Sequence, residues 1–169
     1  NWSMGKKISI DSATMMNKVF EVIEAQKIFN IDKNKFQILI HPKSYIHAIV
    51  KFKTGIIKFL AHDTNMKIPI FNSIYLNKES KIDSNKINLP ILNNLNLALP
   101  NLKKFKSINF IKYIKNSNTF FETILITAND ELVKLYLENK VNFVDIYKLT
   151  KKIIQLSSFK KYLNKTPKN

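Results

Sequence analysis

One stretch near the start of the chain restricts the fold most, because its apolar residues recur at the spacing of an α-helix. Asp11 or Ser12 offers a side-chain oxygen that can cap free backbone N–H groups. The apolar positions that follow are Met15, Met16, Val19, Phe20, Val22, Ile23, Ile28 and Phe29. This spacing predicts a helix over about residues 12–29. The 169 residues are enough for one domain or two small ones with a sizeable core.

Beyond this helix the pattern changes to short apolar runs. Three strands are predicted, the last two forming a hairpin around Thr54-Gly55: residues 36–40, 46–52 and 56–60. A further helix is expected over 66–76, with Pro69 restricting its start.

The second half of the chain has a different composition. Residues 77–101 are rich in lysine, asparagine and serine and carry Pro90 and Pro100, which predicts a connector without continuous regular structure. After it the apolar spacing is helical, and the tail from Lys160 is expected to fray. The predicted class is therefore α+β. A long helix, a small β-sheet and the connector occupy 1–100, and a helical C-terminal domain occupies 101–169.

Composition excludes several classes of protein. The absence of cysteine excludes a disulfide scaffold, a thiolate metal site and a cysteine nucleophile. No apolar run approaches the roughly 18 residues of a membrane span, so no membrane partner is expected. The net charge of +16 invites a nucleic-acid interpretation, but every basic residue is lysine. Arginine is the usual bidentate reader of phosphates and bases, and AT-rich codons explain the abundance of lysine, asparagine and isoleucine, so no nucleic-acid partner is expected.

Polar residues cluster in the first half of the predicted helix. Asn17 and Glu21 are four residues apart and Lys18 and Glu21 three apart, so they share one surface. With Ser12 at the helix start, the hydroxyl, amide and ammonium groups suit a phosphate. The Glu21 carboxylate suits a hard cation. The alternative is a capped helix with a solvated Lys-Glu pair.

The order of residues narrows these alternatives. Residues 1–18 (NWSMGKKISIDSATMMNK), with Glu21 and residues 23–25 (IEA), resemble the substrate-binding segment of the 1-deoxy-D-xylulose 5-phosphate reductoisomerase family. Two further blocks agree in order and approximate spacing. Residues 40–47 (IHPKSYIH) resemble the family's His-Pro-x-Ser-x-x-His segment, and 127–130 (TAND) with 143–146 (FVDI) resemble its helical C-terminal domain.

The resemblance implies an oxidoreductase and isomerase of isoprenoid precursor synthesis. In the implied reaction a divalent magnesium or manganese ion would bind the substrate's oxygens, the carbon skeleton would rearrange, and NADPH would reduce the resulting aldehyde to 2-C-methyl-D-erythritol 4-phosphate. By matching positions, Ser12, Asn17 and Lys18 would bind the sugar phosphate and Glu21 would contribute to substrate binding and ligate the metal. The resemblance also implies a bacterial-type cytoplasmic enzyme that is a homodimer at full length.

Further roles follow from the same resemblance. Trp2, Ser3 and Met4 match a mobile flap over the substrate, and Gly5 and Met66 match positions near NADPH. The implied catalytic residues are Lys18, Glu21 and His47. His47 and Met66 could instead be purely structural, and His41 is interpreted as structural.

The chain also departs from the family pattern. Val19 stands where glycine is usual after the Asn-Lys pair, and Phe20 is larger than expected, so both are predicted to add bulk near the substrate. Lys67-Ile68 replaces the usual Arg-Thr, and Ile126 stands where asparagine is common. The NADPH-binding domain and the Asp-Ser-Glu motif with the other metal carboxylates are expected in a missing N-terminal part. The 169 residues alone are therefore predicted to be inactive. Two alternatives remain: a lysine-rich nucleic-acid-binding protein and a non-catalytic decayed copy.

Overall fold

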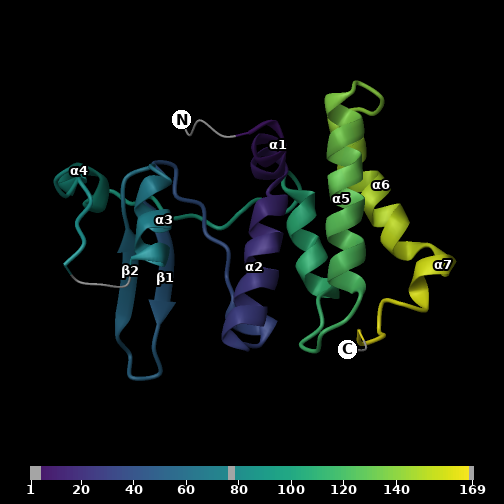
Figure 1. The fold of residues 1–169 in the computed structure, drawn as a ribbon, viewed down its shortest axis with the longest axis horizontal. Helices are drawn as coiled ribbons and strands as arrows, with labels where there is room; N and C mark the ends of the chain where they lie inside the picture. The colour runs from purple at the N-terminus through teal and green to yellow at the C-terminus, as the bar shows by residue number, and fades with distance from the viewer. Residues whose placement is uncertain (1–4, 76–78, 168–169) are drawn as a thin grey trace. The chain divides into compact units, whose positions relative to one another are not determined.

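The computed structural model describes residues 5–75 and 79–167, which divide into two compact units. We call residues 5–38 with 100–167 the helical unit, and residues 39–75 with 79–99 the hairpin unit. Figure 1 shows the elements of each unit along the chain. The α+β class predicted from the sequence is confirmed.

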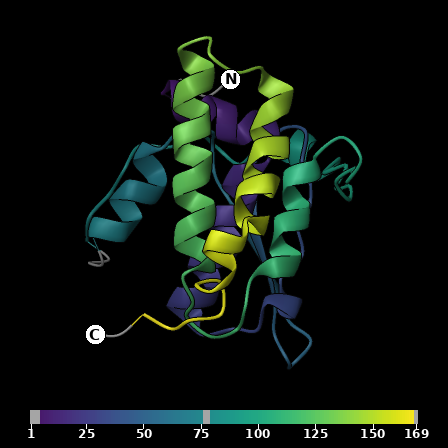
Figure 2. The ribbon, with the colours of Figure 1, turned by 90° about the vertical axis from the view of Figure 1, so that its right-hand side faces the viewer.

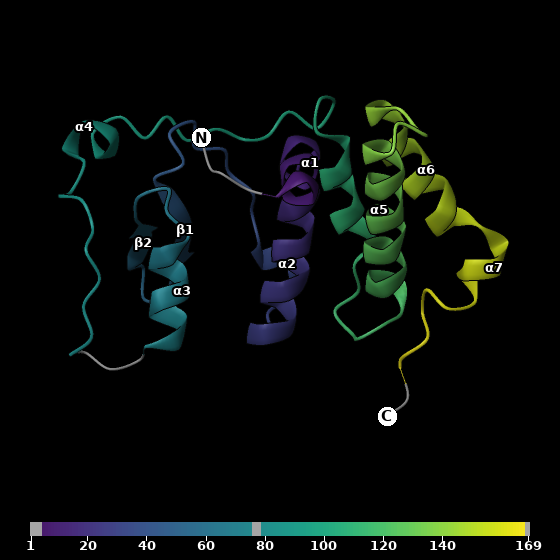
Figure 3. The same cartoon turned by 45° about the horizontal axis from the view of Figure 1, so that its top comes forward.

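The long helix predicted near the start is two helices, α1 (Lys6–Thr14) and α2 (Met16–Phe29), which follow one another in Figure 3. Met15 separates them in the left-handed conformation, with φ 60° and ψ 19°. The prediction that Asp11 or Ser12 caps the helix was wrong, because both lie inside α1. Glycine or asparagine usually takes a left-handed position at a helix end, so a methionine gave no signal of the break.

The helical unit is built on α5 (Phe121–Leu137) and α6 (Phe143–Gln155), which lie side by side in Figure 2. The short helices η1 (Lys33–Lys35), η2 (Lys106–Tyr113) and α7 (Ser157–Lys160) complete it. Its main core joins α2, η2, α5 and α6 through buried apolar side chains, including Met16, Val19, Phe110, Ile114, Leu125 and Ile154.

The chain end is more ordered than predicted. The backbone N–H of Phe120 donates to the carbonyl of Lys165 over 3.1 Å, and Leu163 packs against the main core. Fraying from Lys160 is therefore wrong as far as Lys165, because an apolar side chain anchors this segment. The many lysines of the tail predicted a solvated segment, so the packing of Leu163 was not predicted.

The hairpin unit contains β1 (Ile46–Lys51) and β2 (Ile57–Ala61), paired antiparallel as predicted. Residues 36–40 do not form the third predicted strand, and Ile40 makes only an isolated bridge to Ala98. The helices α3 (Lys67–Ile74) and α4 (Leu89–Leu92) follow, the second inside the predicted connector. Tyr45 is the one buried residue among described residues 39–75 and 79–99.

The two units do not coincide with the predicted domains. Residues 5–38 group with residues 100–167, because α1 packs on α5 and α2 packs on η2. One boundary between the two units falls between residues 99 and 100, close to the predicted domain division. The assignment of functional domains to residues 1–100 and 101–169 stays a prediction. In the described part of the chain, no helix is both long and apolar enough to cross a membrane.

Candidate functional site

The helix α2 has one face for packing and another for polar chemistry. Its buried side chains are Met16, Val19, Val22, Ile23 and Gln26. Asn17, Lys18 and Glu21 lie between these positions, as the helical period requires. The predicted cluster therefore lies outside the buried face of α2, with Glu21 exposed and Asn17 and Lys18 partly buried.

Lys18 and Glu21 contact each other directly. The Lys18 ammonium is 2.9 Å from each oxygen of the Glu21 carboxylate. The Glu21 side chain remains 54% exposed, so this pair is close to solvent. Exposed ion pairs typically contribute less than about 1 kcal/mol, so a stronger ligand could separate the two charges at small cost.

Asn17 and Ser12 complete the predicted phosphate site. Asn17 is partly buried, and its Oδ1 is shielded from solvent without a hydrogen-bond partner among the described residues. Ser12 is also partly buried, but it lies near the end of α1 and its carbonyl accepts the N–H of Met15. Ser12 therefore does not lie at the N-terminal end of α2, the helix that carries Asn17. A cleft shared by these side chains stays a prediction.

The site offers one part of a metal centre. Glu21 is an accessible carboxylate, which is the oxygen donor that magnesium and manganese prefer. Among residues 5–75 and 79–167, no three histidine, cysteine, aspartate or glutamate side chains gather to hold a metal. Glu21 therefore fits as one ligand of a shared site, and further ligands must come from substrate or from residues outside this set.

Gly5 precedes α1, and nothing described lies within 4 Å of the position of a Cβ added there. Its φ of −60° suits any residue, so the backbone does not require glycine. The open space is compatible with a cofactor, although the role of Gly5 stays a prediction. The proposed flap residues Trp2, Ser3 and Met4 lie outside the described residues.

His47 lies at an irregularity in β1, between the pairs Ile46–Ala61 and Ala48–Leu60. Bulges of this kind re-aim a side chain. Its ring stacks on that of His62 with centroids 3.6 Å apart, and its Nε2 is 3.0 Å from the carbonyl oxygen of His62. No motif surrounds His62, so the register of the predicted hairpin was the one signal in the sequence for this pairing.

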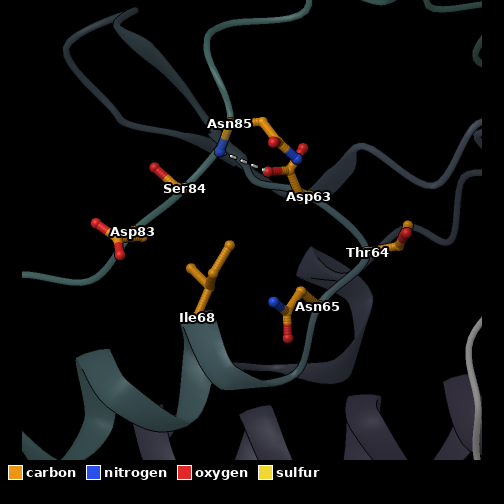
Figure 4. Close-up of a pocket in the computed structure, with 7 residues that line it drawn as sticks. All are labelled: Asp63, Thr64, Asn65, Ile68, Asp83, Ser84 and Asn85. Atoms are coloured by element: carbon orange, nitrogen blue, oxygen red, sulfur yellow. Dashed lines mark hydrogen bonds between the residues drawn. The ribbon is translucent and has the colours of Figure 1, made fainter.

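Met66 lies at the N-terminal end of α3 and is exposed. An open cavity of about 410 Å³ lies between residues 63–65 with Ile68 on one side and residues 83–85 on the other, and Met66 is not among its lining residues (Figure 4). The Asn85 N–H donates to the Asp63 carboxylate over 3.2 Å at its edge. Two carboxylates, Asp63 and Asp83, line this cavity, so its charge does not suit a phosphate. The role of Met66 stays a prediction.

The structure places Val19 in the core, and its predicted effect on the substrate pocket stays a prediction. Val19 is fully buried in the main core of the helical unit, on the opposite side of α2 from Lys18 and Glu21. Phe20 packs partly against the same core, and its ring lies 5.7 Å from the Lys7 ammonium. The added bulk therefore contributes to packing.

Comparison with known proteins shows the family of the chain. A family model described as the 1-deoxy-D-xylulose 5-phosphate reductoisomerase C-terminal domain matches residues 1–29. A second, described as the DXP reductoisomerase C-terminal domain, matches residues 62–168. The chain belongs to the 1-deoxy-D-xylulose 5-phosphate reductoisomerase family, of which it carries the C-terminal part.

Particular relatives give the extent of the likeness. The chain is 55% identical over its whole length to the 1-deoxy-D-xylulose 5-phosphate reductoisomerase of Pelagibacter ubique, and covers 44% of that protein. The corresponding protein of Persephonella marina is 37% identical over 95% of the chain, which covers 43% of that relative. The chain therefore spans less than half the length of these relatives.

Solved structures show the same fold. The reductoisomerase from Zymomonas mobilis in complex with NADPH aligns with a TM-score of 0.82 at 31% identity, over 96% of this chain and 42% of that one. A DOX-P reductoisomerase in complex with NADPH, fosmidomycin and magnesium aligns with a TM-score of 0.84 at 32% identity, over 98% of this chain and 40% of that one.

Proposed function

We propose that these residues form the C-terminal part of an enzyme that converts 1-deoxy-D-xylulose 5-phosphate to 2-C-methyl-D-erythritol 4-phosphate in isoprenoid precursor synthesis. The observation that carries the proposal is the placement of Asn17, Lys18 and Glu21 on α2 outside its buried face, with Lys18 and Glu21 in contact. The 55% identity to the Pelagibacter ubique protein, named for this activity, supports it.

In this proposal the two charges of the Lys18–Glu21 pair take different partners. The Lys18 ammonium turns to the substrate phosphate, while the Glu21 carboxylate donates one oxygen to a magnesium or manganese ion. The Asn17 amide and the Ser12 hydroxyl add hydrogen bonds to the substrate. When bound, the ion polarises substrate oxygens and NADPH supplies a hydride.

The remaining residues have supporting roles. Trp2, Ser3 and Met4 close over the substrate and exclude water, and Gly5 and Met66 lie against NADPH. His47 acts near the reacting atoms. The active protein is a cytoplasmic homodimer. The 169 residues alone hold one metal carboxylate among those described, so they are expected to be inactive without the rest of the enzyme.

The metal role of Glu21 is tested in the full-length enzyme with Glu21→Gln, which keeps the size of the side chain and removes its charge. Loss of a group that only orients a metal ligand typically lowers activity roughly 10–100-fold. Turnover of Glu21→Gln, measured as NADPH consumption, should fall by more than this, because a direct ligand is lost. Excess manganese should restore part of the activity.

The matched control is Glu131→Gln, an exposed glutamate on α5 that lies outside the segment resembling the family's substrate-binding residues. It should leave turnover unchanged. Unchanged kinetics in Glu21→Gln would remove Glu21 from the metal site, and full-length protein without turnover would refute the proposed activity.

A further inference from the structure

A buried carboxylate joins two segments of the helical unit that are far apart in the sequence. Asp11 on α1 is 3% exposed and Asn129 on α5 is fully buried. The Asn129 Nδ2 donates to Asp11 Oδ1 over 2.8 Å, although the residues are 118 positions apart. A buried carboxylate is costly unless hydrogen bonds and opposite charge compensate it. This contact is therefore specific, unlike the apolar packing around it.

Lys7 supplies the opposite charge. Its ammonium is 2.8 Å from Asp11 Oδ2 and 3.0 Å from Asp130 Oδ1. Partial burial by itself lowers the pKa of Lys7, but the hydrogen bonds and charges of Asp11 and Asp130 outweigh it and raise the pKa above 10.5. Lys7 therefore stays protonated at neutral pH, and both Asp11 oxygens have a donor.

This network lies directly before the joint between α1 and α2. The Thr14 hydroxyl is 3.2 Å from the Asp11 carbonyl oxygen and accepts the Met16 N–H over 3.4 Å. Met15 then turns the chain, and Asn17 and Lys18 follow in the first turn of α2. Fixing Asp11 against α5 therefore fixes the direction in which this first turn points.

A second polar contact holds the far end of α2. The Lys27 ammonium is 3.4 Å from Glu122 Oε1, and the Thr119 hydroxyl donates to Glu122 Oε2 over 2.8 Å. Glu122 and Asn129 are two turns apart on the same face of α5. Both contacts join the α1–α2 pair to α5, but only the Asp11 contact is adjacent to the proposed substrate site.

We propose that Asp11 and Asn129 are positioning residues that orient Asn17 and Lys18 for binding the substrate phosphate. This inference rests on the proposed function. Asp11 and Asn129 do not touch the substrate. They act by holding the end of α1 on α5. The Asn17 and Lys18 side chains are then already oriented when the phosphate binds, so binding costs less conformational entropy.

The test compares four variants of the full-length enzyme: Asp11→Asn, Asn129→Asp, the double variant that exchanges the two side chains, and Glu122→Gln. Each single substitution at the Asp11 contact should raise KM for the sugar phosphate about tenfold and change kcat little, because oriented binding groups are lost. The exchanged pair recreates one amide–carboxylate hydrogen bond and should recover most of the affinity. The matched control Glu122→Gln should lower the melting temperature comparably and leave KM unchanged.

An unchanged KM in both single variants would overturn the proposal. So would an equal rise in KM in Glu122→Gln, or an exchanged pair that is as weak as the single variants. If a single variant does not fold, Asn129→Ser, which shortens the side chain without adding charge, replaces it with the same expectation.

Amide hydrogen exchange separates this inference from the proposed function. If the unsubstituted enzyme turns over no sugar phosphate, the proposed function fails. Faster exchange at residues 16–18 in Asn129→Asp than in Glu122→Gln would then still support the positioning role, and equal exchange would refute it.

Discussion

The helical and hairpin units differ in how they bury apolar side chains. Among the described residues, every buried apolar side chain except Tyr45 belongs to the helical unit. Both strands of the hairpin unit are exposed almost throughout, including Ile49, Phe59 and Leu60. A two-stranded sheet without a covered face is marginally stable in water. Among the described residues, helix formation and core packing therefore support each other in the helical unit, while the hairpin unit is held mainly by backbone pairing.

The largest expected difference comes from truncating one apolar side chain in each unit. Leu125→Ala leaves a cavity in the main core and should lower the free energy of unfolding by about 3 kcal/mol. The matched change Phe59→Ala, at a half-exposed site on β2, should cost less than about 1 kcal/mol. Denaturant unfolding followed by helical circular dichroism measures both. Equal losses would contradict the contrast between the units.

Amide hydrogen exchange measures the same contrast without substitution. Amides of β1 and β2 should exchange about 100-fold faster than those in the middle of α5, because local opening of the hairpin exposes little apolar surface. Peptide-resolved mass spectrometry can compare Ile46–Lys51 with the central turns of Phe121–Leu137. Similar protection would show that the hairpin is stabilised by more than its own pairing.

Within the hairpin unit, Tyr45 provides a smaller test. Its hydroxyl accepts the Asn88 N–H over 3.3 Å. Tyr45→Phe should cost about 1 kcal/mol or less and speed exchange at the start of α4. Tyr75→Phe, at an exposed ring, is the control and should change neither property. An identical effect of the two substitutions would rule out a specific tie through the Tyr45 hydroxyl.

The smallest expected effect is a pH dependence of the helical unit. Because the folded pKa of Lys7 is raised above 10.5, its contribution to stability is fully present below pH 10.5 and is lost as the pH rises through the folded value. Lys7→Met should remove this part of the alkaline decline in melting temperature. Lys6→Met, at an exposed neighbour, should leave it in place. Parallel declines in all three proteins would contradict the role of Lys7.

Sequence periodicity predicted most of the elements, because apolar spacing reflects burial in a helix. It succeeded for α2, α5 and α6 and for the hairpin around Gly55. It missed the break at Met15, since the left-handed turn is held by Thr14 and the packing of α1 rather than by a glycine. It also placed a strand at 36–40, where Phe36 and Ile38 pack against the main core and Ile40 forms only an isolated bridge.

The candidate site was predictable only in part. The spacing of Lys18 and Glu21 gave their contact correctly, because residues three apart on a helix are neighbours. The contact between Asp11 and Asn129 joins distant parts of the chain, so local spacing could not reveal it. One signal was available: Asn129 is a polar residue among the apolar positions Leu125, Leu132 and Val133 of α5. A polar residue at such a position needs a buried partner.

The two faces of α2 also bear on how this helix can change over generations. Val19 contributes to the interior, whereas Lys18 and Glu21 face outward. A mutation on the interior side of α2 therefore acts mainly on the stability of the fold. A mutation on the outer side acts on the polar groups that face solvent. Because the two sides of α2 meet different requirements, the interior can accommodate a bulky side chain such as Val19 without a change in the groups on the outer side.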